Sequence, residues 1–175
     1  ATVLAEEKAI QWEKSKTYLI TGGFGGIGIT VAKEMLSCGA NVALLSRSEL
    51  PDRSEWVKIR AFSGHADKTA RKIKLVQDLE QLGGSIEVVT GDVCNLVEMQ
   101  EAVAATKKAF GSIHGVIHAA GAIDDGPLLT KSSAQVEDVL APKIHGTMIL
   151  DQIFADGELE FLALFSSSST VLAPA

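Results

Sequence analysis

The chain has 175 residues, of which 46% are hydrophobic and 22% charged, and its formal net charge is -6. This much apolar material supports one domain with one core, and the negative charge argues against nucleic-acid binding, which needs clustered Lys and Arg. There is no apolar run of about 18 residues and no signal-peptide pattern, so we expect a soluble, cytoplasmic protein with no membrane segment. Cys38 and Cys94 have neither CxxC spacing nor nearby histidines, so we expect free thiols and no metal site.

The first predicted element is a buried strand over residues 17–21, where the run TYLIT stops at a glycine cluster. A helix is predicted from Gly26 to Cys38, because apolar residues recur every four positions and Gly39 suits a helix C-terminus. Short, mostly apolar runs predict further strands at residues 41–46, 85–90, 113–118 and 159–166. Amphipathic stretches predict helices around residues 66–82, 96–109 and 133–155. The last helix is expected to break near Pro142, because proline removes a helix hydrogen bond.

Apolar strands that alternate with helices predict a parallel sheet covered on both faces, which is a doubly wound α/β fold. We expect the Rossmann-like strand order 3-2-1-4-5, with the sheet incomplete on its C-terminal side. Residues 48–64 are mostly polar, and we expect them to form a surface insertion in which Trp56 is exposed.

The turn after the first strand reads TGGFGGIG and satisfies two dinucleotide-binding patterns, GxGxxG and TGxxxGxG. Its glycines allow the backbone to approach a pyrophosphate at a helix N-terminus, where free N–H groups favour an anion. The alternative is a flexible glycine turn, but the position between a strand and a helix favours the cofactor. The candidate cofactor-binding residues here are Thr21, Gly22, Gly23, Phe24, Gly25, Gly26, Ile27 and Gly28.

The ends of three other predicted strands supply further candidates, since ligands of open α/β sheets bind beyond the carboxyl ends of the strands. The second strand ends at Ser46 and Arg47, where folds specific for NAD carry an acid. A guanidinium at this place suits a 2′-phosphate and predicts NADPH. Arg47 could instead be an ordinary solvated charge. Asp92, which precedes Val93, could bind the adenine amino group or cap the next helix. The small residues after the fourth strand let the cofactor lie against the backbone, and they are Ala119, Ala120 and Gly121. His118 is expected to be a hydrogen-bonded histidine without a catalytic role.

The motifs TGGFGGIG, LLSRS, GDV, HAAG and LFSSSS, in this order and at these spacings, resemble the short-chain dehydrogenase/reductase superfamily. Within it, TGGxGGxG, SRS and HAAGAIDDGPL resemble the ketoreductase domain of modular polyketide synthases. The resemblance implies a partial NADP-binding catalytic subdomain at 17–175, preceded at 1–16 by a linker or the end of another subdomain. It also implies transfer of the 4-pro-S hydride of NADPH to the β-keto group of an acyl chain on an acyl carrier protein. Other domains of the same synthase would be partners.

The same resemblance implies a catalytic lysine, serine, tyrosine and asparagine. The lysine matches Lys143 in APKIHGT, which would also bind the cofactor, and the serine matches Ser167. The tyrosine and asparagine of the family project beyond Ala175, and Tyr18, the only tyrosine, lies in the first strand. We therefore expect reductase activity only together with a segment that carries these two residues.

Ile123, Asp124 and Asp125 follow the fourth strand, where B-type ketoreductases, which form the D-hydroxyl product, usually carry Leu-Asp-Asp. The tryptophan typical of A-type enzymes projects to Leu172, so both signs favour B-type. The two aspartates could instead cap a helix or lie in a loop. Two other functions fit the same motifs: a catalytically inactive dinucleotide-binding domain of a synthase, and a free-standing short-chain reductase of a small ketone.

Overall fold

A five-stranded parallel sheet in the order β3-β2-β1-β4-β5 forms the centre of the fold. The computed structural model describes residues 11–64, 67–124 and 126–167. The strands are β1 (Thr17–Thr21), β2 (Asn41–Ser46), β3 (Ser85–Thr90), β4 (Gly115–His118) and β5 (Phe161–Leu164). The predicted α/β doubly wound fold and its strand order are confirmed.

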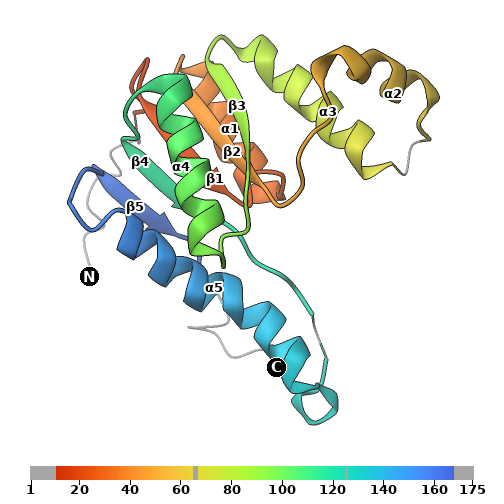
Figure 1. The fold of residues 1–175 in the computed structure, drawn as a ribbon, viewed down its shortest axis with the longest axis vertical. Helices are drawn as coiled ribbons and strands as arrows, with labels where there is room; N and C mark the ends of the chain where they lie inside the picture. Colours follow the sequence, from red (N-terminus) through yellow and green to blue (C-terminus); the bar gives the residue numbers. More distant parts are fainter. Residues whose placement is uncertain (1–10, 65–66, 125, 168–175) are drawn as a thin grey trace, which may run out of the picture.

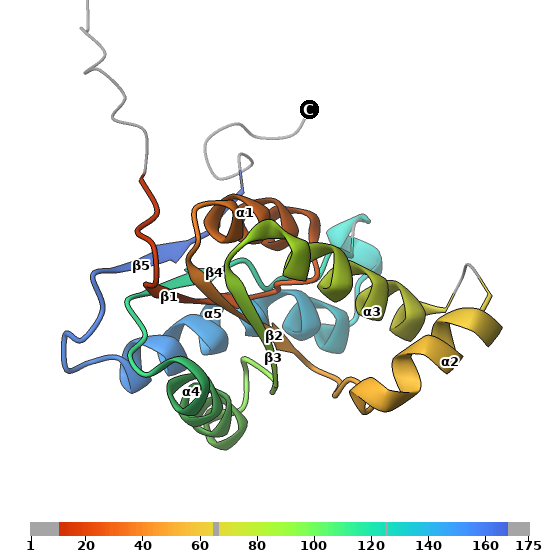
Figure 2. The same cartoon turned by 90° about the horizontal axis from the view of Figure 1, so that it is seen from above.

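Helices cover both faces of the sheet (Figures 1 and 2). They are α1 (Gly26–Ser37), α2 (Trp56–Phe62), α3 (Lys68–Leu79), α4 (Leu96–Phe110) and α5 (Ser133–Ile153), with short 3-10 turns η1 (Arg53–Glu55), η2 (Glu80–Leu82) and η3 (Leu128–Thr130). Helices α1 and α3 lie on one face, α4 and α5 lie on the other, and α2 packs against α3. The carboxyl ends of all five strands therefore meet at one edge, between two helical layers.

The side chains of each strand pack alternately into two separate hydrophobic cores, one on each face of the sheet. In β1, Tyr18 and Ile20 pack with Met35 of α1, whereas Leu19 packs with Met99 of α4 on the opposite face. Side chains of a strand point alternately to the two faces, and here both faces are covered. The result is the continuous apolar run that identified these strands in the sequence.

Several element boundaries differ from those predicted. β4 begins at Gly115 rather than at residue 113, although Ile113 is already buried in the core beside α4. β5 is confined to Phe161–Leu164, within the predicted 159–166. The helix predicted around 66–82 is α3, followed by the turn η2. A buried apolar run and the hydrogen-bonded part of a strand need not end at the same residue. The sequence pattern indicates only which residues are buried.

The predicted break at Pro142 is wrong, because α5 runs without interruption from Ser133 to Ile153. Proline in a helix costs one backbone hydrogen bond and crowds the preceding turn. Here contacts on both sides of the proline hold the helix together. A capping box formed by Ser132 and Gln135 begins it, Leu150 is fully buried near its end, and the carbonyl of Pro142 itself is hydrogen-bonded to the sheet through His118.

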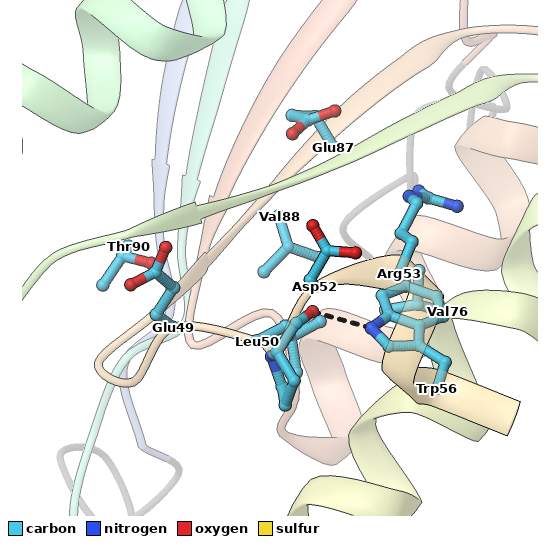
Figure 3. A pocket seen from close by; sticks show the side chains of 10 residues that line it. Glu49, Leu50, Asp52, Arg53, Trp56, Val76, Glu87, Val88 and Thr90 are labelled. Atoms are coloured by element: carbon cyan, nitrogen blue, oxygen red, sulfur yellow. Dashed lines mark hydrogen bonds between the residues drawn. The ribbon is translucent and has the colours of Figure 1, made fainter. Parts of the chain in front are cut away.

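The prediction that Trp56 is exposed is also wrong. Residues 48–64 form η1 and α2, and Trp56 is only 5% exposed in the core under α3. Its indole N–H donates to the carbonyl of Pro51 at 2.8 Å, and the Arg53 guanidinium lies 4.7 Å from its ring centroid. A small cavity of about 250 Å³ lies between the entry to α2 and the edge strand β3. Trp56 is one of the residues that line it (Figure 3). One large aromatic thus anchors a polar segment whose composition resembles a loop.

Candidate cofactor-binding and active site

The glycine turn between β1 and α1 packs directly against the end of β4. Gly22 has φ +67°, and a Cβ there would lie 2.5 Å from the carbonyl oxygen of Ala119. A Cβ on Gly28 would lie 2.6 Å from the carbonyl oxygen of Gly22. Both positions therefore require glycine, for backbone conformation in the first case and for close packing in both. The N-cap of α1 is Gly25, and no acidic residue lies in the first turn, which leaves a helix N-terminus suited to an anion.

A cavity of about 670 Å³ opens at the carboxyl edge of the sheet. Its lining includes nine residues predicted to bind a cofactor, namely Gly22, Phe24, Gly25, Ser46, Arg47, Asp92, Val93, Ala120 and Gly121. Residues from α3 and α5 complete the walls. The edge where four strands end therefore holds a groove large enough for a nucleotide.

The other candidates from the glycine turn lie around this cavity rather than on its surface. Thr21 is fully buried on β1, and Gly23 packs on Leu44 so closely that a Cβ would lie 2.7 Å from its Cδ2. Ile27 is about half exposed on α1. The cavity-lining residues Gly22 and Gly25 are joined by a hydrogen bond from the amide of Gly25 to the carbonyl of Gly22 at 2.9 Å.

Asp92 stabilises the turn before α4 and does not cap the helix. Its Oδ1 accepts from the amide of Cys94 at 2.8 Å, whereas Asn95 is the N-cap of α4. Burial, followed by the charge of Asp92, raises the pKa of the Cys94 thiol. Cys38 and Cys94 are free thiols, as predicted. The cap alternative for Asp92 is therefore wrong, while Asp92 does line the cavity.

Lys143 and Ser167 lie at the same edge of the sheet as the glycine turn. Lys143 is exposed on α5, next to the cavity-lining Pro142, and its Cε lies 3.7 Å from where a Cβ on Gly121 would be. Beyond β5, the amide of Phe165 donates to the carbonyl of His118 at 3.0 Å, which extends the β5 backbone along the end of β4. Ser167 is exposed two residues later and is not part of the cavity lining. The cavity thus ends beside Lys143.

His118 joins the glycine turn to α5. Its Nδ1 lies 2.6 Å from Oγ1 of Thr21, its Nε2 lies 2.8 Å from the carbonyl oxygen of Pro142, and the residue is 4% exposed. A carbonyl only accepts, so Nε2 carries the proton and Nδ1 accepts from the Thr21 hydroxyl. Burial lowers the pKa of His118, and the bond to Pro142 opposes this. The predicted hydrogen-bonded histidine is confirmed.

Sequence reasoning missed two lysines on this cavity. Lys68 and Lys72 of α3 both line it. Lysines on an amphipathic helix are ordinarily solvated, and only the spacing of four residues, which places both on one helix face, could have drawn attention to them.

The loop after β4 carries the predicted stereochemistry motif. Ile123 is 88% exposed, and Asp124 forms an ion pair with Lys131 at 3.2 Å, while the same lysine also donates to the Asp124 carbonyl. Because Ser132 caps α5, Asp124 is a loop residue and not a helix cap. Asp125 and Leu172 lie outside the described residues.

Within 11–64, 67–124 and 126–167, no cluster of three His, Cys, Asp or Glu side chains could hold a metal ion. None of the helices in these ranges is both long and apolar enough to cross a membrane.

Comparison with known proteins places this site in a family. The profile of the KR domain matches residues 16–175. The chain is 38% identical over 158 residues to 6-methylsalicylic acid synthase of Aspergillus terreus, covering 89% of the chain and 9% of that protein. It is 35% identical over 173 residues to polyketide synthase PksM of Bacillus subtilis, covering 95% of the chain and 4% of that protein. The chain therefore spans less than a tenth of these relatives.

Solved structures agree with the sequence comparisons. An N-terminal ketoreductase from the macrolactin assembly line superimposes with a TM-score of 0.78 at 30% identity, over 97% of this chain and 31% of that one. A ketoreductase domain from the bacillaene assembly line superimposes with a TM-score of 0.79 at 26% identity, over 98% and 37%. With its motifs, its sheet order and these matches, the chain belongs to the KR domain family, the ketoreductases of polyketide synthases within the short-chain dehydrogenase/reductase fold.

Proposed function

We propose that this chain is the cofactor-binding part of an NADPH-dependent ketoreductase. It would act on the β-keto group of an acyl chain carried by an acyl carrier protein of a polyketide synthase. As a member of the KR domain family, the chain is part of an oxidoreductase that uses a nicotinamide dinucleotide. The observation that supports NADPH binding is the cavity that the glycine turn, Arg47 and Gly121 line together at one edge of the sheet.

The residues at this edge fit a dinucleotide. Glycine at positions 22 and 28 permits close backbone packing that a Cβ would prevent, and this packing holds the glycine turn and the α1 N-terminus beside the cavity. Ser46 and Arg47 at the end of β2 would bind the adenosine ribose, with the guanidinium on a 2′-phosphate. The small residues Ala120 and Gly121 would face the nicotinamide end.

When bound, NADPH supplies the hydride that reduces the ketone. The carbonyl oxygen then gains negative charge and needs a proton, which the family takes from a tyrosine. The ammonium of Lys143, beside Gly121, would stabilise a nearby phenolate and so lower its pKa. The hydroxyl of Ser167 would donate to the developing oxyanion, where preorganised donors act most strongly.

We further propose B-type stereochemistry, with a D-hydroxyl product. Ile123 and Asp124 support this because they match the B-type motif apart from one Leu-to-Ile change, and the Asp124–Lys131 ion pair ties the loop to the start of α5. Other domains of the same synthase and an acyl carrier protein are the proposed partners, since the relatives are far longer synthases.

The test is reduction of a β-ketoacyl thioester by the complete protein that contains this chain. We expect NADPH to be consumed and a D-hydroxyacyl product to form. Ser167→Ala should lower kcat by about 100-fold, the scale of losing one oxyanion donor. Ser166→Ala, at the neighbouring exposed serine, is the matched control and should leave kcat unchanged.

Three results would change the proposal. Tight NADPH binding without any reduction would favour the inactive dinucleotide-binding domain. Reduction of small ketones with no preference for thioesters would favour the free-standing reductase. An L-hydroxyl product would refute the B-type assignment alone.

A further inference from the structure

Lys72 reaches from α3 across to the end of β2. Its ammonium nitrogen lies 2.9 Å from Oγ of Ser46 and 2.8 Å from Oγ of Ser48, and 5.1 Å from the ring centroid of Phe24 in the glycine turn. The two serines flank Arg47, so three segments distant in sequence meet at one end of the cavity. Figure 2 shows α3 on the same face of the sheet as α1, which follows the glycine turn.

Two cations, Arg47 and Lys72, lie at this end of the cavity. Of the residues that the structure describes, no Asp or Glu lies within ion-pair distance of Arg47 or Lys72. Burial, followed by the charge of Arg47, lowers the pKa of Lys72. A bound anion would relieve this repulsion. An ammonium also has three N–H donors, and the serines account for two, which leaves one for a ligand oxygen.

We propose that Lys72 is a second cation for the 2′-phosphate of the cofactor and, together with Arg47, determines the preference for a 2′-phosphorylated nucleotide. This inference rests on the proposed function, because it assigns a ligand to the same cavity. A phosphate monoester carries nearly two negative charges at neutral pH, so one guanidinium leaves it incompletely neutralised. Phe24 beneath the ammonium and the two serines beside it fix the Lys72 side chain before the ligand arrives.

Adenosine 2′,5′-bisphosphate and 5′-AMP differ only by the 2′-phosphate, so their affinities isolate this contact without any turnover. In the complete protein, titration calorimetry should show that Lys72→Met weakens the bisphosphate about tenfold or more, the loss of one charge-assisted hydrogen bond. Its affinity for 5′-AMP should change less than twofold. Lys72→Gln, which keeps a polar group near the serines, should show the same selective loss, and Lys72→Arg should restore most of the affinity.

Lys74→Met is the matched control, because Lys74 lies on the same helix but pairs with Asp78 at 2.5 Å and does not line the cavity. It should leave both affinities unchanged. If Lys72 only braces α3 against the end of β2, its variants will weaken both nucleotides equally or neither, and the inference is overturned. If the unmodified protein binds both nucleotides equally, the NADPH assignment itself fails. A strong preference for the bisphosphate that survives Lys72→Met refutes only the role of Lys72.

Discussion

Removing the buried ring of His118 should loosen the junction between the glycine turn and α5. His118→Leu loses hydrogen bonds to Thr21 and Pro142, each contributing about 1 kcal/mol, and leaves the buried Thr21 hydroxyl without its acceptor. We expect a loss of about 3 kcal/mol in local stability. Hydrogen exchange of the β1 and β4 amides in the complete protein measures this directly, because it reports opening of these strands.

A double-mutant cycle separates the hydrogen bond from simple loss of volume. Thr21→Val alone should cost about 1–2 kcal/mol, because it leaves Nδ1 of His118 unpartnered. Combined with His118→Leu, it removes both partners, so the double variant should lose about 1–2 kcal/mol less than the sum of the singles. Additivity within about 0.5 kcal/mol would refute the reasoning.

The same histidine gives a pH dependence with a defined sign. Because burial lowers the pKa of folded His118, the unfolded chain binds its proton first, at about pH 6.5. This contribution to stability is therefore complete above about pH 6.5 and declines as the pH falls toward the lower folded pKa. The double variant should lack this dependence of stability on pH. If its stability still falls with pH in the same way as that of the unmodified protein, His118 is not the group responsible.

Three further substitutions test the fold around the cavity. Gly22→Ala should lower the free energy of unfolding by about 2–4 kcal/mol and weaken nucleotide binding at least tenfold in calorimetry. The reason is that Gly22 has a left-handed conformation and that a Cβ there would collide with the Ala119 carbonyl. Gly26 has open space around it, so Gly26→Ala should change neither quantity. Trp56→Ala should lower the free energy of unfolding by about 3–5 kcal/mol and speed amide hydrogen exchange throughout α2. Unchanged hydrogen exchange in α2 would show that the core does not depend on this ring. Asp67 is the N-cap of α3, and its carboxylate accepts from the amides of Thr69 and Ala70. Asp67→Ala should therefore speed hydrogen exchange at these two amides several-fold, and unchanged exchange would refute this capping role.

Local sequence patterns were sufficient to predict most of the fold. The five strands are short and apolar because both faces of the sheet are covered, and each could be located from sequence alone. The predictions at Pro142 and Trp56 were wrong. A proline ordinarily indicates a helix break and a polar segment ordinarily indicates a loop, but here contacts with distant residues override both patterns. Those contacts are the bond from His118 to Pro142 and the packing of Trp56 under α3.

The sequence by itself located the strands, the glycine turn and the strand ends that carry the candidate site, because these depend on periodicity and on residues close together in the chain. Only the tertiary structure decided which side chains complete the cavity. Lys72 meets Ser46 across 26 residues, and His118 meets Thr21 across 97. The contact of Lys72 depends on how α3 packs against the sheet, and the contact of His118 depends on the parallel pairing of β4 with β1. No local sequence pattern encodes either placement.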